Sequence, residues 1–173
     1  PFKDDDEILD LAARAGCWYM YQAIVDDSDH IRRRIERAKE RGIGVEGTIL
    51  LGLDDHDEDY IKRLIDFLLD VELDLAEFTI LTPFPHSPVR SHLESEGRIF
   101  HNDWIRYTGD EVVFQPRRMT ADSLQEMYEY AWKTFYASCS KEIQMAKLYL
   151  KVLEMEKKDG TYKRVRLSPD RSW

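Results

Sequence analysis

Two segments of the sequence combine strand-like residues with residues that favour a binding site. Residues 46–59 (EGTILLGLDDHDED) end in a glycine and an acidic run, and residues 78–88 (FTILTPFPHSP) end in a proline-rich loop. Prolines cannot continue a strand ladder, so the chain must leave the sheet after Thr82. Binding sites of parallel sheets form at the carboxyl ends of the strands. We therefore expect both segments to meet at one edge of a sheet and to form a ligand site there.

Three glycines, Gly44, Gly47 and Gly52, lie in the strand predicted at 43–53. Glycine weakens a strand, so it is used where a ligand or another backbone must approach closely. Relief of crowding inside a packed barrel explains the same residues equally well. The sequence leaves both readings open.

Glu46 and Glu77 fall within strands that otherwise look buried. A carboxylate in such a place is costly unless it is paired or faces a water-filled cavity. Each is therefore a candidate ligand for a cationic or hydroxylated cofactor inside a barrel. The alternative is a salt bridge to an arginine on a neighbouring helix, which we favour for Glu77.

The acidic run at residues 54–59 shares one property with calcium-binding loops, because Asp55, Asp57 and Asp59 alternate. Such loops need glycine at the sixth position, and here that position is Tyr60. Carboxylates also complement the positive end of a helix dipole. We therefore expect a helix start at this run and no metal site.

Other polar and aromatic residues allow two readings each. His86 lies in the proline-rich loop, where an imidazole either serves a bound ligand as a proton carrier or merely completes a turn. The five histidines show no paired spacing typical of metal ligands. Trp104, Tyr107, Phe114 and Trp132 offer the sides of an apolar substrate pocket, or ordinary core.

The hydrophobic pattern predicts the elements that must position these residues. Apolar runs indicate strands at 17–25, 43–53 and 75–82, and helical spacing indicates helices at 5–15, at 29–41 and from the acidic run to residue 71. Alternation of this kind calls for a parallel sheet with helices packed outside it. The fold class is therefore α/β.

The carboxyl-terminal part changes character. A short helix is expected at 89–96 and a last short strand at 111–115, followed by two helices that form an antiparallel pair packed against the rest. Their apolar stripes are Leu124, Met127, Ala131 and Phe135 on the first helix, and Ile143, Ala146, Leu150 and Leu153 on the second. The predicted organisation is an α/β unit at 1–118, a helical extension at 119–158 and a polar tail at 159–173, where Trp173 suggests a late contact.

The composition excludes several classes of protein. The chain has 173 residues, 43% of them hydrophobic, which suffices for a core and argues against a disordered protein. Its formal charge of -9 does not attract nucleic acid or anionic lipid. No apolar run is long enough to span a bilayer and no signal peptide is recognisable, so we expect a cytoplasmic protein.

Cys17 and Cys139 lie far apart and are expected to be reduced thiols. The start at Pro1, without an initiating Met, suggests a preceding part.

These elements, taken in order, resemble a known family. Three stretches carry the resemblance: residues 44–69 (GVEGTILLGLDDHDEDYIKRLIDFLL), then LDLAEFTILTPFPHSP, then the later GRI, DW and VVFQP elements. Together they are similar to the latter half of cobalamin-binding-type radical S-adenosylmethionine proteins. Relatives of the anaerobic magnesium-protoporphyrin monomethyl ester cyclase look most similar. The resemblance covers most of residues 6–157.

The resemblance implies a partial TIM-type barrel, of which this chain would be the carboxyl-terminal half. The family's CxxxCxxC motif, which binds a four-iron four-sulfur cluster, has no match in this sequence. The residues implied to contact S-adenosylmethionine are Glu46, Thr48, Ile49, Gly52, Leu81, Thr82 and Pro83. One departure is QAIVDDSD, where relatives carry a Gly-Val-Glu-Ser-like strand end, so standard cofactor contact from this strand is not expected.

The chain is accordingly interpreted as a fragment of a radical S-adenosylmethionine iron-sulfur oxidoreductase or methyltransferase that is inactive alone. Its parent would use S-adenosylmethionine and the cluster, with cobalamin as a further candidate cofactor that the sequence leaves open. The missing amino-terminal part would be the partner of this chain. Exposed strand edges predict that the isolated chain associates with itself. The alternative is a small α/β protein-interaction module without catalytic activity. A hydrolase ranks last, because no GxSxG motif or phosphate-binding glycine loop is present.

Overall fold

The computed structural model describes residues 5–137, 139–158 and 160. Its elements, in chain order, are α1 (Asp6–Arg14), β1 (Tyr19–Ile24), α2 (Asp29–Glu40), β2 (Gly44–Leu51), α3 (Glu58–Asp70), β3 (Leu75–Ile80), α4 (Pro88–Ser95), the 3-10 helix η2 (Trp104–Arg106), α5 (Ala121–Tyr136) and α6 (Cys139–Lys158). Within these residues, no helix has the length and apolar content required to cross a bilayer.

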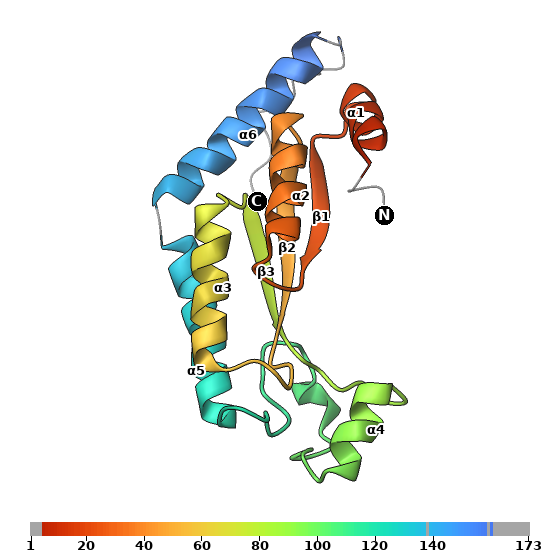
Figure 1. The fold of residues 1–173 in the computed structure, drawn as a ribbon, viewed down its shortest axis with the longest axis vertical. Coiled ribbons are helices and arrows are strands. Elements are labelled where there is room, and N and C mark those ends of the chain that lie inside the picture. The colour runs from red at the N-terminus through yellow and green to blue at the C-terminus, as the bar shows by residue number, and fades with distance from the viewer. Residues whose placement is uncertain (1–4, 138, 159, 161–173) are drawn as a thin grey trace, which may run out of the picture.

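The three strands form one parallel sheet in the order β1-β2-β3, as the alternating pattern predicts. Helices α2 and α3 connect successive strands, and α5 lies beside α3 (Figure 1). The α/β class and the parallel sheet are therefore confirmed. The sheet is open, so a closed barrel is not formed by the described residues of this chain.

Local sequence explains where the helices begin. The side chain of Ser28 accepts a hydrogen bond from Ile31 N at the start of α2, and Thr120 accepts one from Ser123 N at the start of α5. Asp57 accepts one from Tyr60 N at 2.8 Å at the start of α3. These are ordinary N-caps, which satisfy amides that the first helical turn leaves unpaired. The acidic run therefore starts a helix, as predicted.

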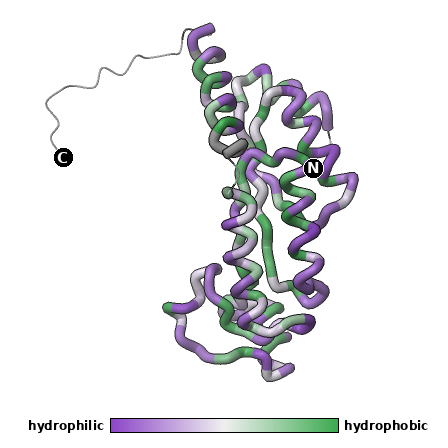
Figure 2. Tube along the Cα trace, turned by 90° about the vertical axis from the view of Figure 1, so that its left-hand side faces the viewer, coloured by the Kyte–Doolittle hydropathy of each residue, from purple (hydrophilic) through white to green (hydrophobic). Residues whose placement is uncertain are grey.

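The two faces of the sheet differ. Side chains on one face alternate into a core against the helices, and the largest of them include Ile49, Leu51 and Phe78, each 1% exposed or less. Figure 2 shows hydrophobic and hydrophilic residues alternating along the helices, as expected of helices that pack one side against a core. Gln22 is the polar exception on this face: it is 1% exposed, and neither of its amide atoms has a partner among the described residues.

The second face, called the open face below, is covered by a helix at its amino end, where Leu148 of α6 packs against Gly44, and is less covered toward the carboxyl end. The strand register places ten residues on it: Tyr19, Tyr21, Ala23, Gly44, Glu46, Thr48, Leu50, Leu75, Glu77 and Thr79. Most of these side chains are half-buried or exposed, and Tyr21 is 62% exposed.

The two outer edges of the sheet also differ. On β3, the hydroxyl of Tyr136 accepts a hydrogen bond from Ala76 N at 3.0 Å and donates one to Ala76 O at 2.7 Å. Ile80 N on the same strand donates to Gly109 O at 2.6 Å. On β1, the described residues place no partner outside the sheet's own ladder on the backbone of Tyr21 or Ala23. The β3 edge, paired at Ala76 and Ile80, is called the sealed edge below, and the β1 edge, unpaired at Tyr21 and Ala23, the available edge. At the two ends of β1, the thiol of Cys17 donates to Tyr19 O and the hydroxyl of Tyr60 to Val25 O.

Two sequence-based predictions about the carboxyl-terminal part are wrong. Residues 111–115 form no strand but a single antiparallel bridge, between Ile99 and Phe114. The second predicted stripe does not pack: Ile143 is 54% exposed and Leu150 60%, whereas Leu148 is buried. Helix α6 does not fold back along α5 but continues across the amino ends of the strands (Figure 1). The first stripe, on α5, is in the core or packed against it as predicted.

Trp173 and the tail at 161–173 lie outside the described residues, and so does the side chain of Cys139.

Candidate functional site

The carboxyl edge of the sheet brings the two predicted segments together. Leu81 N donates a hydrogen bond to Leu51 O at 2.8 Å, directly after β3 and at the end of β2. Gly52 and the proline-rich loop consequently start from adjacent points of the same edge. We call this edge, with the loops that follow β2 and β3, the rim. Its position agrees with the rule that sites of parallel sheets form at carboxyl ends.

The residues proposed to contact a cofactor are divided between environments. Glu46 and Thr48 lie on the open face, half-exposed. The side chain of Ile49 points into the helix-covered core, which leaves only its backbone for a ligand on the open face. At the rim, Leu81 and Thr82 are half-buried and Pro83 is buried. The Thr82 hydroxyl donates to Ile80 O at 2.9 Å.

The three glycines are explained by packing against protein atoms. A Cβ on Gly44 would approach Leu148 Cδ2 to 2.7 Å, and one on Gly52 would approach Leu124 Cδ2 to 2.8 Å. Gly47 faces Leu73 in the same manner. Gly52 also has a φ of +90°, which favours glycine. Of the two readings, relief of crowding has direct structural support at each position.

The two strand carboxylates have different partners. The hydroxyl of Tyr19 donates a hydrogen bond to Glu46 Oε2. Burial, reinforced by this carboxylate, raises the pKa of Tyr19 well above its usual range, so the phenol remains a proton donor at physiological pH. Glu77 is exposed on the open face and has no partner among the described residues. The predicted salt bridge from Glu77 to an arginine of a neighbouring helix is therefore wrong for the described part of the chain.

An ion cluster lies beside the rim, in the loop after β2 and at the end of α4. Arg98 contacts Asp54 at 2.7 Å and Glu96 at 2.8 Å, and Arg117 lies 2.6 Å from Glu96. His92 joins the two carboxylates at 3.8 and 3.6 Å. The hydrogen bond from Arg98 lowers the pKa of Asp54, and the same arginine lowers that of Glu96.

Asp54, His92 and Glu96 lie close enough together to hold a metal ion. Two guanidinium groups already neutralise the two carboxylates, and a cation would have to displace them. The contacts observed in the cluster are those of a clamp between the loop after β2 and the end of α4.

Arg90 connects the proline-rich loop to the segment that follows α4. This residue is only 7% exposed, donates to Pro83 O at 3.2 Å and to Glu94 at 2.7 Å, and lies 4.7 Å over the ring of Trp104. Its hydrogen bond with Tyr107 raises the pKa of Arg90 further. Sequence reasoning missed this contact, because an arginine on a short polar helix looks like a solvent-exposed residue.

The predicted aromatic pocket is largely core. Phe114 is fully buried and Tyr107 is 6% exposed. Trp132 packs at 5.5 Å against Phe78. Trp104 alone of the four has half of its surface exposed. Ordinary packing is therefore the better reading for the other three.

Two histidines of the rim loops behave differently. His86 is exposed and has a φ of +61°, so it completes a turn, and no ligand role is needed to explain it. His56 is 3% exposed and stacks on Tyr60 with ring centroids 4.3 Å apart. Burial lowers the pKa of His56, so the imidazole is neutral at physiological pH. Its Nδ1 atom has no partner among the described residues.

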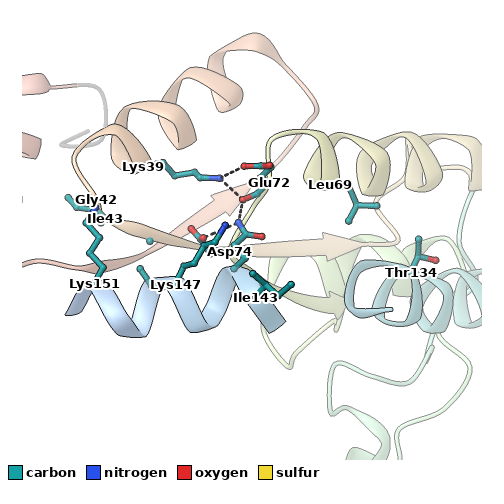
Figure 3. A pocket seen from close by; sticks show the side chains of 13 residues that line it. Lys39, Gly42, Ile43, Leu69, Glu72, Asp74, Thr134, Ile143, Lys147 and Lys151 are labelled. Carbon is teal, nitrogen blue, oxygen red and sulfur yellow. Dashed lines mark hydrogen bonds and ion pairs between the residues drawn. The ribbon is translucent and has the colours of Figure 1, made fainter. Parts of the chain in front are cut away.

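A second site candidate lies at the opposite, amino end of the strands. A cavity of about 640 Å³ separates α6 from the ends of α2 and α3 (Figure 3). Lys39 donates to Glu72 O at 2.6 Å, and Gln144 of α6 donates to Asp74 Oδ1 at 3.1 Å. Asp74 in turn accepts from Val45 N at 2.9 Å. These contacts attach α6 to the turn before β3, and in barrels this end serves stability more than chemistry.

Comparison with known proteins gives distant relatives. The chain is 25% identical over 141 residues to bacteriochlorophyllide d C-12(1)-methyltransferase of Chlorobaculum tepidum, which covers 73% of the chain and 30% of that protein. It is 24% identical over 102 residues to the uncharacterized methyltransferase PH0819 of Pyrococcus horikoshii, covering 59% of the chain and 22% of that protein. It is 23% identical over 105 residues to the anaerobic magnesium-protoporphyrin IX monomethyl ester cyclase of Cereibacter sphaeroides. This match covers 61% of the chain and 17% of that protein.

These matches support a loose relation to methyltransferases and to this cyclase. The chain spans less than a third of the length of each of these curated relatives. No family model matches the chain.

Proposed function

We propose that this chain forms one wall of a radical S-adenosylmethionine enzyme, an iron-sulfur oxidoreductase or methyltransferase, and contributes part of its cofactor and substrate site. The supporting observation is the rim, where the ends of β2 and β3 join through the hydrogen bond from Leu81 N to Leu51 O. The ordered sequence resemblance and the methyltransferase and cyclase relatives support the same assignment.

In this proposal the nucleoside part of S-adenosylmethionine binds at the rim and at the adjoining, carboxyl-terminal part of the open face. Thr48 supplies a half-exposed hydroxyl, and Leu50 and Leu81 supply apolar surface of the kind that an adenine ring contacts. When bound with the cluster, this cofactor is the source of a 5'-deoxyadenosyl radical. The chain's own residues position it and exclude water from it.

The cluster itself does not fit this chain. Four-iron four-sulfur clusters are held by cysteine thiolates, and the sequence contains only Cys17 and Cys139. Cys17 is half-buried, with its thiol directed at Tyr19 O at 3.5 Å. The cluster ligands, and with them catalysis, belong in this proposal to a preceding part of the protein.

The test begins with the reading frame that precedes residue 1, where a CxxxCxxC motif is expected. The full-length protein is then reconstituted anaerobically with iron and sulfide and assayed for 5'-deoxyadenosine. Leu81→Asp should raise the KM for S-adenosylmethionine, whereas Ile143→Asp, on exposed α6, should leave it unchanged. Absence of the motif, or a reconstituted protein that forms no 5'-deoxyadenosine, would overturn the proposal.

A second candidate is a small α/β protein-interaction module, which one observation favours. Ile143, Leu150 and Leu153 are exposed on one side of α6, at the spacing of a helix-pairing seam. Such a seam also provides a route for the chain to associate with itself. Light scattering of the chain at high concentration tests this candidate, because Leu150→Lys should then reduce the measured mass. A monomeric wild-type chain would count against it.

A further inference from the structure

The loop that follows β3 has few hydrogen-bond donors of its own. Residues 81–87 (LTPFPHS) include Pro83 and Pro85, and a proline has no backbone N–H. Phe84 N donates to Thr82 O at 2.9 Å, which makes one tight turn in this loop. The carbonyl groups of the loop therefore need donors from elsewhere, above all where they are buried.

Arg90 of α4 supplies such a donor. Its Nη1 atom donates to Pro83 O at 3.2 Å, and both residues are buried. Among the described residues, no other donor reaches this carbonyl. Glu94 accepts from Arg90 Nε at 2.7 Å and compensates its charge within the same helix. The backbone at Pro83 thus depends on one side chain for its hydrogen bond.

The same guanidinium also holds the segment that follows α4. Arg90 Nη2 donates to Asn102 Oδ1, and the guanidinium carbon lies 4.7 Å from the centre of the Trp104 ring. A guanidinium presents five donors in one rigid plane, which a lysine ammonium cannot reproduce. Arg90 therefore joins the loop after β3, helix α4 and the segment around Trp104, all beyond the carboxyl ends of the strands (Figure 1).

Two hydrogen bonds delimit the stretch of loop that belongs to the rim. Leu81 N donates to Leu51 O at 2.8 Å at its start, and Pro83 O accepts from Arg90 at its end. Only Thr82 lies between these two anchored residues, so the backbone of the stretch has little freedom. Because Arg90 is only 7% exposed, its effect on a ligand at the rim passes through this backbone.

Loss of Arg90 would release one of the two anchors. The loop would then populate several conformations, of which only a fraction has the shape that receives the ligand. The apparent affinity falls in proportion to that fraction, whereas a saturating ligand selects the competent conformation. A released anchor therefore raises KM and leaves kcat close to that of wild type.

We propose that Arg90 is a positioning residue for S-adenosylmethionine, because its bond to Pro83 O keeps Leu81 and Thr82 in the shape that receives the cofactor. This inference rests on the proposed function and adds to it a residue that acts on the cofactor site from behind the loop.

The test uses the reconstituted full-length protein and measures KM and kcat for S-adenosylmethionine from the formation of 5'-deoxyadenosine. Arg90→Ala should raise KM by about tenfold and leave kcat within about twofold of wild type. Added guanidinium ion, below the concentration at which the wild type begins to unfold, should lower the KM of this variant. Arg90→Lys keeps the charge without the planar fork, so its KM should also rise.

The matched control is Arg106→Ala. Arg106 belongs to the segment that Arg90 holds, but it is exposed and pairs with Glu111. Its KM should equal that of wild type and should not respond to guanidinium. Circular dichroism and thermal unfolding verify that each variant is folded, and Arg90→Lys carries the test if Arg90→Ala is not.

The outcomes separate the two proposals. A wild-type protein that forms no 5'-deoxyadenosine would overturn the proposed function and this inference with it. If the wild type is active, an unchanged KM in both Arg90 variants would overturn the positioning role alone. The same holds for a KM that rises equally in Arg106→Ala, or for a raised KM in Arg90→Ala that guanidinium does not lower.

Discussion

The two outer edges of the sheet, on β1 and on β3, differ in the hydrogen-bond partners of their outward backbone groups, although both belong to short parallel strands. At β3, Tyr136 of α5 pairs with both backbone groups of Ala76, and Gly109 O accepts from the amide of Ile80. At β1, the corresponding groups of Tyr21 and Ala23 have no partner outside the ladder in the described part of the chain. The outer edge of β3 is thus tied to α5 and to the Gly109 loop, whereas the described contacts beside β1 lie at its two ends. More unpaired backbone is therefore exposed beside β1 than beside β3 in the described part of the chain.

The largest effect is expected where the sealed side is anchored. Phe78 is 1% exposed and packs against Trp132 and Phe135 of α5. Phe78→Ala should lower the free energy of unfolding by about 3–5 kcal/mol, because it leaves a cavity between β3 and α5. Chemical denaturation measures this loss. Phe100→Ala, at a half-exposed ring, serves as the control, and an equal loss in both variants would contradict the anchoring role.

The seal itself is tested by a smaller change. Tyr136→Phe keeps the ring, which stacks on Trp132 at 5.5 Å, and removes both hydrogen bonds to Ala76. The expected loss is about 1–3 kcal/mol, since two backbone groups become unpaired. Hydrogen exchange of the Ala76 amide should accelerate. Tyr130→Phe on the same helix should change neither quantity, and unchanged exchange in Tyr136→Phe would refute the seal.

A pH-dependent contact at the end of β1 gives the third prediction. Tyr60 donates to Val25 O at 3.2 Å, and His56 stacks on the same ring. Burial lowers the pKa of His56 below its ordinary 6.5, so the unfolded chain binds a proton that the folded chain does not. The contribution of neutral His56 to the free energy of unfolding should be fully present above pH 6.5. Below that pH, the free energy of unfolding should fall by up to about 1.4 kcal/mol per pH unit.

Denaturation curves between pH 7 and 5 measure this dependence, in a range above the titration of the carboxylates. His56→Phe retains the stack and should flatten the curve. His86→Asn, at an exposed turn that tolerates a positive φ, should leave the dependence as in wild type. An unaltered slope in His56→Phe would assign the effect to another group.

The smallest effect is expected at the available edge. Tyr21 is 62% exposed on β1, so Tyr21→Lys should change the stability of the isolated chain by no more than about 0.5 kcal/mol. A loss as large as that of Tyr136→Phe would show that the contact of the Tyr21 ring with Tyr19, at 5.7 Å between centroids, stabilises the chain more than its exposure indicates. Denaturation under identical conditions makes the two edges directly comparable.

The regular part of the fold could be predicted from the sequence because its signals are local. The strands predicted at 17–25, 43–53 and 75–82 contain the observed β1, β2 and β3, and the helix at 29–41 matches α2 closely. The rim was predictable as well, since Gly52 and the prolines after Thr82 mark strand ends that a parallel sheet brings together.

The misses involve partners that are distant in sequence. The residues EVVFQ at 111–115 have strand-like composition, but only Phe114 finds a bridging partner. Tyr136 and Ala76 are 60 positions apart, and no local pattern indicates that they meet. The apolar spacing on α6 predicted that Ile143 and Leu150 are buried, but the structure buries Leu148. Apolar spacing shows that a helix is amphipathic, but it does not show which element packs against the helix.

The hydroxyl of Tyr136 has a consequence for any larger assembly. Ring closure of a barrel requires its last strand to pair with its first, and β3 cannot do so while this phenol occupies Ala76. A barrel completed through β1 would therefore retain a lateral seam beside β3. At that seam, α5 and the Gly109 loop stand where a strand would otherwise be, so this side of the assembly would be closed by helix and loop contacts instead of by a strand ladder.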